Sequence, residues 1–430
     1  MTVTAERPRV ADFRLPLAHR RELLDAGVLD PVAYHRDLVA YVRAEDPRLR
    51  AFVDWRPADV ADPGTPSVTY KDTIDVAGYA TRLGVRSGYR HYPERSAGIA
   101  RRLAERGLPC AGKVSTTECA LGSVKPSRNP VYPHVSTAGS STGSAVAVAA
   151  GFCDVSVGTD SGGSLRWPAV YCGVTALRLT PHPDLLDGVH AVAPSMESVG
   201  LVVRTPHDLD WLWREYRLAE LAGAGATAGG PADGPAGPLR VAVSGPPGEV
   251  LHPEVARLLS EVRAGLAARG HTVSRADLPD VWRIRVPAAE LLSREAYDSF
   301  APLLRTPDVE LGADTRAAIV AGAGIDDSRY AALRARQDEE CARLAVLLRD
   351  RYDLLVLPLE PGLPDPASGP PAVSTQGPNF TLVANFARLP VLAMPLTLSS
   401  QGSPLGVQVL AAPGADDLLV AAGVALAEIR

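Results

Sequence analysis

Apolar and polar residues alternate along this chain in a rhythm that changes several times from helical to extended. Near the start, apolar residues recur every three or four positions over residues 23–28 and again over residues 38–42. This spacing predicts two helices. We expect the Asp46-Pro47 pair to end the second helix and a short strand to follow over residues 49–53.

Strands and helices then alternate up to about residue 179. Short apolar runs bounded by turn residues predict strands, and apolar residues at helical spacing predict helices. The predicted strands cover residues 68–70, 108–114, 155–158 and 173–179, and the predicted helices cover residues 97–107 and 145–151. This alternation favours an α/β fold, with a mixed or mostly parallel sheet covered by helices.

The second half of the chain begins with a compositional break. Residues 221–238 are rich in alanine, glycine and proline and predict a flexible surface loop. Beyond it, the pattern predicts strands over residues 241–244, 354–358, 389–398 and 405–410, and helices over residues 255–270, 317–351 (interrupted near Gly324) and 416–429.

Composition narrows the class of protein. The chain has 430 residues, 46% of them hydrophobic, and a formal net charge of −5, so nothing in its charge favours nucleic acid or an anionic membrane as a partner. Five cysteines without a CxxC pair favour reduced, mostly buried thiols over disulfides or a metal site. The N-terminus has no apolar signal segment, and we expect a cytoplasmic protein.

One stretch, residues 138–169, stands out for its chemistry. It carries a Gly/Ser turn at each end, joined by a run of small residues and a short predicted strand. Exposed backbone N–H groups and serine hydroxyls in one place indicate a site for an anion or an oxyanion. The stretch contains no GxxxxGK[ST] phosphate loop, no GxGxxG fingerprint and no GxSxG nucleophile elbow.

These two turns, together with several segments elsewhere in the chain, resemble the amidase signature hydrolases. That family includes the short amidases such as the indole-acetamide hydrolases. The resemblance covers most of the chain. Its segments are DPRLRAFV from Asp46, YKDTIDVAG from Tyr70, the stretch just described, NFARLPVLAMPL from Asn385 and GSPLGVQVL from Gly402. It implies a large central mixed sheet covered by helices on both faces, in a single amidase domain over residues 1–430. Within that domain we expect a signature core over about residues 64–205 and a variable substrate-side half over residues 239–430.

The resemblance also implies a Ser–cis-Ser–Lys triad. By motif, Ser164 is the acyl-forming nucleophile, Ser140 the bridging serine after a cis peptide bond, and Lys71 the base. None of these motifs holds a histidine, and a serine hydroxyl needs a base to become a nucleophile. A lysine serves only when neutral, which burial favours by lowering its pKa. Lys113 and Lys125 are the competing lysines, but neither has the strand-end context of Lys71.

The other residues of the two turns are expected to support this chemistry. The backbone N–H groups of four consecutive residues would form the oxyanion hole: Ser161, Gly162, Gly163 and Ser164. Four more residues are expected to support the loops: Gly139, Ser141, Asp160 and Arg166, the last two through hydrogen bonds and a charge pair.

Two departures from the family pattern bear on the walls of the site. Residues 177–182 lack the usual Gly-Arg turn, so this wall is expected to differ, and the altered segment extends to about residue 190. Glu197 stands where aspartate is usual. Neither departure removes a member of the triad.

The leading hypothesis is an amidase that cleaves a small carboxylic amide to an acid and ammonia or an amine. Three alternatives stay open: an acyl transferase that uses the same acyl-enzyme, an amidotransferase subunit, and an inactive scaffold. The expected partner is the small-molecule substrate, with no nucleic acid or membrane, and a homodimer stays open. No metal or organic cofactor is implied.

Overall fold

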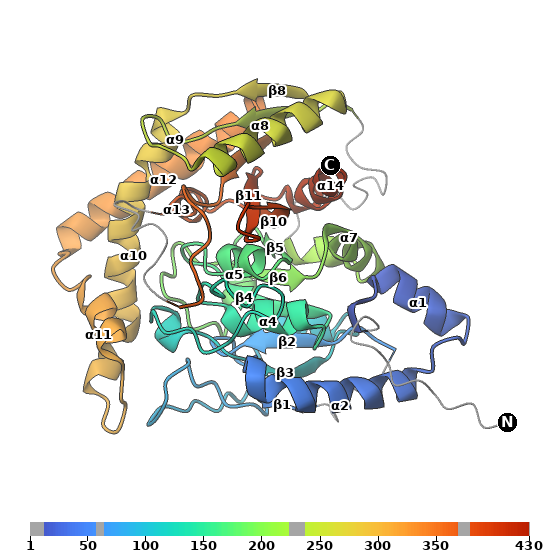
Figure 1. Ribbon diagram of the computed structural model, residues 1–430. Coiled ribbons are helices and arrows are strands. Elements are labelled where there is room, and N and C mark those ends of the chain that lie inside the picture. Colours follow the sequence, from blue (N-terminus) through green and yellow to red (C-terminus); the bar gives the residue numbers. More distant parts are fainter. Residues whose placement is uncertain (1–12, 57–63, 223–236, 369–378, 430) are drawn as a thin grey trace.

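One eleven-stranded mixed sheet runs through the molecule (Figure 1), with the strand order β1-β3-β2-β4-β6-β5-β10-β11-β9-β7-β8. The computed structural model describes residues 13–56, 64–222, 237–368 and 379–429. The strands are β1 (Phe52–Trp55), β2 (Val68–Lys71), β3 (Cys110–Val114), β4 (Val155–Thr159), β5 (Thr175–Arg178), β6 (Val199–Val203), β7 (Arg240–Val243), β8 (Thr272–Arg275), β9 (Leu354–Pro358), β10 (Val391–Leu398) and β11 (Pro404–Leu410).

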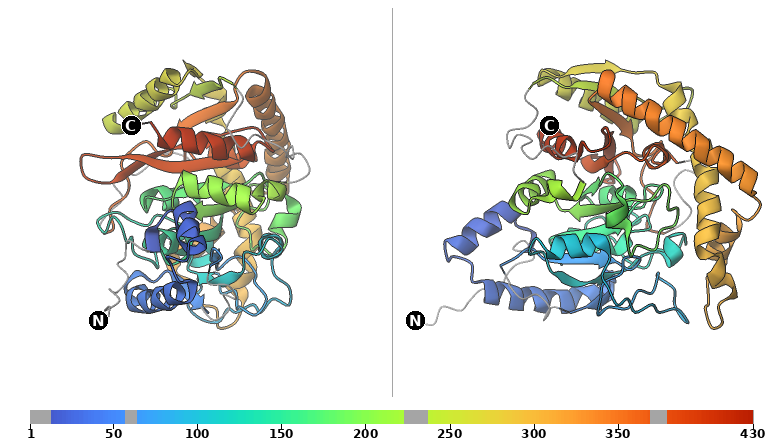
Figure 2. Two further views of the ribbon diagram at one scale, coloured as in Figure 1. Left: turned by 90° about the vertical axis from the view of Figure 1, so that its right-hand side faces the viewer. Right: turned by 180° about the vertical axis from the view of Figure 1, so that it is seen from behind.

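Helices surround this sheet. They are α1 (Leu17–Asp25), α2 (Pro31–Leu49), α3 (Gly98–Ala104), α4 (Thr142–Ala150), α5 (Arg166–Tyr171), α6 (Pro183–Leu186), α7 (Pro206–Glu215), α8 (Pro253–Ala268), α9 (Pro279–Arg283), α10 (Arg285–Phe300), α11 (Ala313–Val320), α12 (Asp327–Asp350), α13 (Leu382–Phe386) and α14 (Asp416–Ala427). Helices α10, α11 and α12 lie together on one flank of the molecule, and α1 lies on the opposite flank (Figures 1 and 2).

The central strands are covered on both faces. In β6, Leu201 and Val203 pack into the large cluster that includes residues of α7, α8 and α14, whereas Val202 packs into the cluster built around α4. Successive side chains of a strand point to opposite faces of a sheet, so these two clusters cover opposite faces at β6. The expected mixed sheet with helices on both faces is confirmed.

The arrangement of β3, β2 and β4 positions the site. β2 pairs in parallel with both neighbours, and Tyr70 lies opposite Val157 of β4. The carboxyl ends of parallel strands meet at one edge of a sheet. Lys71 and Thr159, the last residues of β2 and β4, are therefore brought side by side.

Helix α4 packs closely against the central strands and the chain that follows β3. All nine of its residues are buried, and they are small or β-branched. A Cβ atom built on Gly143 would lie 2.4 Å from the backbone nitrogen of Ser115. The absence of a side chain at Gly143 thus allows the helix to approach the chain that follows β3, and this fixes the turn that leads into α4.

Most predicted elements are observed, with one clear error at Asp46-Pro47. Helix α2 continues through Pro47 to Leu49 and ends with Arg50 in the left-handed conformation. The carboxylate of Asp46 accepts hydrogen bonds from the backbone N–H groups of Ala51 and Phe52, at 2.8 and 3.3 Å. Asp46, which lies in the last turn of α2, thus stabilises the chain that leaves the helix. Strand β1 starts three residues later than expected.

The long helical region of the second half divides as the sequence predicts, since α11 ends at Val320 and α12 begins at Asp327. The sequence did not reveal two strands, β6 and β8, or six helices: α5, α6, α7, α9, α10 and α13. Most of the predicted loop at residues 221–238 lies outside the described residues. All five cysteines are free, and Cys119, Cys153 and Cys172 are buried. No helix in the described ranges combines the length and apolar character needed to cross a bilayer.

Candidate active site

Lys71 lies at the centre of the candidate site. Its side chain is fully buried at the end of β2. The Nζ atom donates hydrogen bonds to Ser140 Oγ at 2.7 Å and to Thr159 Oγ1 at 2.8 Å. The lysine thus connects the first Gly/Ser turn to the end of strand β4.

The first Gly/Ser turn holds Ser140 in a fixed position. The peptide bond between Gly139 and Ser140 is cis, as the family resemblance implies. The carbonyl oxygen of Ser140 accepts hydrogen bonds from the backbone N–H groups of Thr142 and Thr117, at 2.8 and 3.2 Å. Ser140 is almost completely buried, so its hydroxyl faces the interior and Lys71.

The second turn, residues 160–165, lies directly against the first. The Ser141 N–H group donates to the carbonyl oxygen of Ser164 at 3.0 Å, and the Ser141 hydroxyl donates to the carbonyl oxygen of Thr159 at 3.3 Å. Ser164 is only half-buried, whereas Ser140 is buried. In the described part of the chain no hydrogen bond joins their two hydroxyls. Ser164 is therefore the more accessible of the two serines. Ser140 is the buried one, and its hydroxyl contacts Lys71.

The surroundings of Lys71 set its protonation. Burial lowers the pKa of Lys71 from 10.5 to about 8, although the carboxylates of Glu197 and Asp160 act in the opposite direction. A substantial fraction of such a lysine is neutral near physiological pH. Lys71 can therefore accept a proton, which a solvent-exposed lysine rarely does.

Glu197 is a buried carboxylate whose charge acts on Lys71. One of its oxygens accepts hydrogen bonds from the Ser161 hydroxyl and from the Val192 N–H group, the latter at 3.1 Å. Its other oxygen, Oε1, is buried and has no hydrogen-bond partner among the described residues. Burial raises the pKa of Glu197. Glu197 therefore contacts the second turn through Ser161, and its charge raises the pKa of Lys71.

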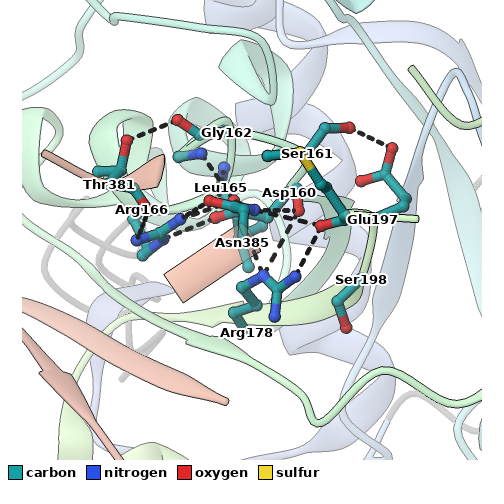
Figure 3. A network of polar contacts seen from close by, with 12 residues as sticks. Asp160, Ser161, Gly162, Leu165, Arg166, Arg178, Glu197, Ser198, Thr381 and Asn385 are labelled. Carbon is teal, nitrogen blue, oxygen red and sulfur yellow. Dashed lines mark hydrogen bonds and ion pairs between the residues drawn. The ribbon is translucent and has the colours of Figure 1, made fainter. Parts of the chain in front are cut away.

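The interior of the second turn is organised by Asp160 (Figure 3). Its carboxylate accepts two hydrogen bonds from the Arg166 guanidinium, both at 2.9 Å, and one from the Asn385 amide, also at 2.9 Å. Burial by itself would raise the pKa of Asp160, but the Arg166 charge and hydrogen bonds hold it well below its usual range. The expected ion pair of Asp160 and Arg166 is thus present, completely buried.

The Asp160 carboxylate also occupies one of the four backbone N–H groups that were expected to form the oxyanion hole. The Gly163 N–H group donates to Asp160 Oδ1 at 2.7 Å, so it is already occupied, contrary to our expectation that it faces a substrate oxygen. The N–H groups of Ser161, Gly162 and Ser164 donate to no protein acceptor within the described ranges. Three of the four expected oxyanion donors therefore remain available.

Only glycine fits at position 163, because of its backbone conformation and its close neighbour. Its φ angle is +110°, and a Cβ atom there would lie 2.4 Å from Thr381 Oγ1. The Thr381 hydroxyl in turn donates to the carbonyl oxygen of Gly162 (Figure 3). Glycine at this position allows the segment before α13 to cover the turn.

The two competing lysines have other neighbours than the serines. Lys113 is buried and its Nζ atom lies 3.4 Å from Asp72 and 3.0 Å from the Thr81 hydroxyl. The Lys125 ammonium lies beside Gly139, 3.3 Å from where a Cβ atom would stand. Within the described residues, neither lysine forms a hydrogen bond with Ser140 or Ser164.

Sequence reasoning missed three residues that the structure places at the site: Thr159, Thr381 and Asn385. Thr159 precedes Asp160 in the Gly/Ser-rich turn, but only the strand register shows that it meets Lys71. Asn385 opens the family segment NFARLP, yet its contact with Asp160 joins residues 225 positions apart.

Comparison with known proteins identifies relatives of the whole chain. A family model described as Amidase matches residues 66–420. The chain is 29% identical to a Glutamyl-tRNA(Gln) amidotransferase subunit from Thermus thermophilus, with 96% of this chain and 97% of the relative covered. It is 36% identical to the Indoleacetamide hydrolase of Pseudomonas savastanoi, over 47% of this chain and 45% of that relative.

Solved structures share the fold across the full chain. A crystal structure described as an amidase superposes with a TM-score of 0.79 at 26% identity and covers 96% of this chain and 99% of that one. A 6-aminohexanoate cyclic dimer hydrolase superposes with the same TM-score at 23% identity, over 97% of both chains.

Proposed function

Because the chain belongs to the amidase family, we propose that it hydrolyses a small carboxylic amide to an acid and ammonia or an amine, through an acyl group on Ser164. The observation that carries this proposal is the 2.7 Å contact between the buried Lys71 ammonium and the Ser140 hydroxyl. A fully buried lysine that is hydrogen-bonded to a serine of the first turn, with the more accessible Ser164 on the second turn packed against it, suits proton transfer.

In the proposed first half-reaction, neutral Lys71 accepts the proton of Ser140 while Ser140 accepts that of Ser164. The Ser164 oxygen attacks the amide carbon and forms a tetrahedral intermediate. The C–N bond then breaks, and the leaving nitrogen takes the proton back through Ser140. Water repeats the sequence on the acyl-serine and releases the carboxylic acid.

The developing negative charge on the amide oxygen would be met by the free N–H groups of Ser161, Gly162 and Ser164. Each donor of this type is worth about 3–4 kcal/mol in the transition state. The ion pair of Asp160 and Arg166 holds the turn that presents them. Fixed donors of this kind need no rearrangement when charge develops.

The direct test replaces Lys71, Ser140 and Ser164 by alanine, one at a time, and assays a panel of aryl and alkyl amides. We expect each variant to lose nearly all activity. Ser144→Ala is a matched control, because Ser144 lies in the same stretch and its buried hydroxyl has no partner among the described residues. It should stay active. Full activity in Ser164→Ala would contradict the proposal.

A second candidate function is that of an amidotransferase subunit. It is supported by the 29% identity with a subunit of that name over almost the full length of both chains. The two functions differ in their dependence on other chains. Ammonia release from simple amides by the purified chain alone supports the free hydrolase, and activity that appears only with added partner subunits supports the amidotransferase.

A further inference from the structure

A cluster of two histidines and an aspartate lies outside the triad. Asp75 and His91 belong to the chain that follows β2, and His190 lies between α6 and β6. Asp75 Oδ1 lies 3.0 Å from His190 Nε2, and Asp75 Oδ2 lies 3.3 Å from His91 Nε2. One nitrogen or oxygen atom from each of the three residues lies within 4.8 Å of the others. None of the three residues takes part in the proposed hydrolysis.

These distances suit a metal ion. Zn²⁺ binds histidine nitrogen and carboxylate oxygen at about 2.0–2.2 Å, and two ligands at the tetrahedral angle are then about 3.3 Å apart. The separation between Asp75 Oδ2 and His91 Nε2 matches this value, and the His190 Nε2 atom lies 0.3 Å closer than this to the other carboxylate oxygen, Oδ1. The histidine rings lie 5.5 Å apart between centroids and are inclined by 68°, so they approach the aspartate from different directions.

The backbone holds each ligand in place. His91 and Thr81 exchange two backbone hydrogen bonds, at 2.8 and 2.9 Å, and the His190 N–H group donates to the carbonyl oxygen of Thr73 at 2.8 Å. The Asp75 N–H group donates to the carbonyl oxygen of Gly188 at 3.0 Å. Three segments of the chain are thereby fixed around one point, and little conformational entropy is lost when a ligand binds there.

A second layer of contacts orients the carboxylate. The Thr81 hydroxyl donates to Asp75 Oδ1 at 2.8 Å and accepts a hydrogen bond from Lys113 Nζ at 3.0 Å. Such outer hydrogen bonds are typical of metal sites, where they set the orientation of the ligands. The Asp75 side chain is 9% exposed, whereas those of His190 and His91 are 26% and 44% exposed. An ion can therefore enter from solvent and keep water as a fourth ligand.

We propose that Asp75, His91 and His190 form a binding site for a divalent transition-metal ion, with Zn²⁺ as the best-matched ion. The site is separate from the hydrolytic chemistry. It would tie residue 91 and residue 190 to the segment that directly follows the strand of Lys71. Its expected effect is on stability, because an ion that binds only the folded chain raises the melting temperature.

The test is isothermal titration of the EDTA-treated protein with ZnCl₂. We expect one equivalent to bind with micromolar or tighter affinity and the melting temperature to rise. His91→Ala and His190→Ala should each weaken binding at least tenfold, and the double variant should abolish it. His207→Ala, an exposed histidine on α7, should bind as the unaltered protein does. Ser164→Ala should also bind Zn²⁺, so the result does not depend on the proposed amidase activity.

A measurement on the unaltered protein covers the case in which the variants fail to fold. Co²⁺ in a tetrahedral site gives intense visible absorption, which Zn²⁺ should displace. No saturable binding of either ion by the folded protein would overturn the proposal. Unchanged binding in a folded double variant would overturn it as well, because the ion would then lie elsewhere.

Discussion

At the scale of single residues, the account depends on the protonation of Lys71. Its hydrogen bonds to Ser140 and Thr159 and its full burial are the observations behind its proposed role as the base. Lys71→Met keeps the length and removes the basic nitrogen. We expect kcat to fall about 10²–10⁴-fold, the usual contribution of general acid–base catalysis.

A steady-state assay with the best amide substrate measures this loss. Lys125→Met is the control, because the Lys125 ammonium lies beside Gly139 but has no hydrogen bond with either serine among the described residues. Its kcat should stay within about tenfold of the unaltered enzyme. If the two variants lost activity equally, the assignment of Lys71 as the base would be wrong.

Glu197 should tune the same lysine. The base is active when neutral, so kcat/KM should rise with pH through the lysine pKa of about 8. The Glu197 carboxylate raises this pKa, and its removal in Glu197→Gln therefore lowers it. The rising limb of the pH profile should move to lower pH in the variant.

The pH profile of kcat/KM checks this sign. Gln can still accept the hydrogen bond from the Ser161 hydroxyl, so the turn is expected to persist. Glu22→Gln, on the exposed face of α1, should leave the profile in place. A limb that stayed fixed or moved to higher pH in Glu197→Gln would show that Glu197 does not act on Lys71.

At the scale of the element, the turn between β4 and α5 depends on one buried ion pair. Arg166 and Asp160 are both fully buried, and Arg166 supplies two of the hydrogen bonds to the carboxylate. Arg166→Met leaves that carboxylate without its main counter-charge. Breaking a buried pair in this way costs about 3–5 kcal/mol of unfolding free energy.

Urea denaturation followed by circular dichroism gives the unfolding free energy of this variant. The comparison is Arg36→Met, which removes a guanidinium from an exposed pair with Asp37 and should leave the stability unchanged. Equal stability of the two variants would mean that the turn does not depend on the pair.

The turn also marks the limit of prediction from sequence. The motif included both serines, the aspartate and the arginine, and the pattern of apolar residues predicted β2 and β4, the two strands that end at the site. Neither the motif nor the apolar pattern indicated that the Asp160 carboxylate would accept a hydrogen bond from the Gly163 N–H group. The direction of a backbone N–H depends on the φ angle of each turn residue, which Gly/Ser composition leaves open.

At the scale of the whole molecule, the sheet order could not be derived from the chain. Strand β10 pairs with β5, more than 200 residues earlier, and this brings α13 and Asn385 to the turn around Asp160. Local apolar patterns predict strands but contain no information on which strands pair. The family resemblance supplied the expected architecture, and residues such as Thr381 and Asn385 emerge only from the assembled sheet.

The central claim is that Ser164 is the acyl-forming nucleophile. Intact-mass and peptide mass spectrometry after treatment with a fluorophosphonate probe test it most directly. We predict a single phosphonyl adduct on Ser164, absent in Ser164→Ala and strongly slowed in Lys71→Met. A stoichiometric adduct on another serine, or equal labelling of Ser164→Ala, would contradict the account.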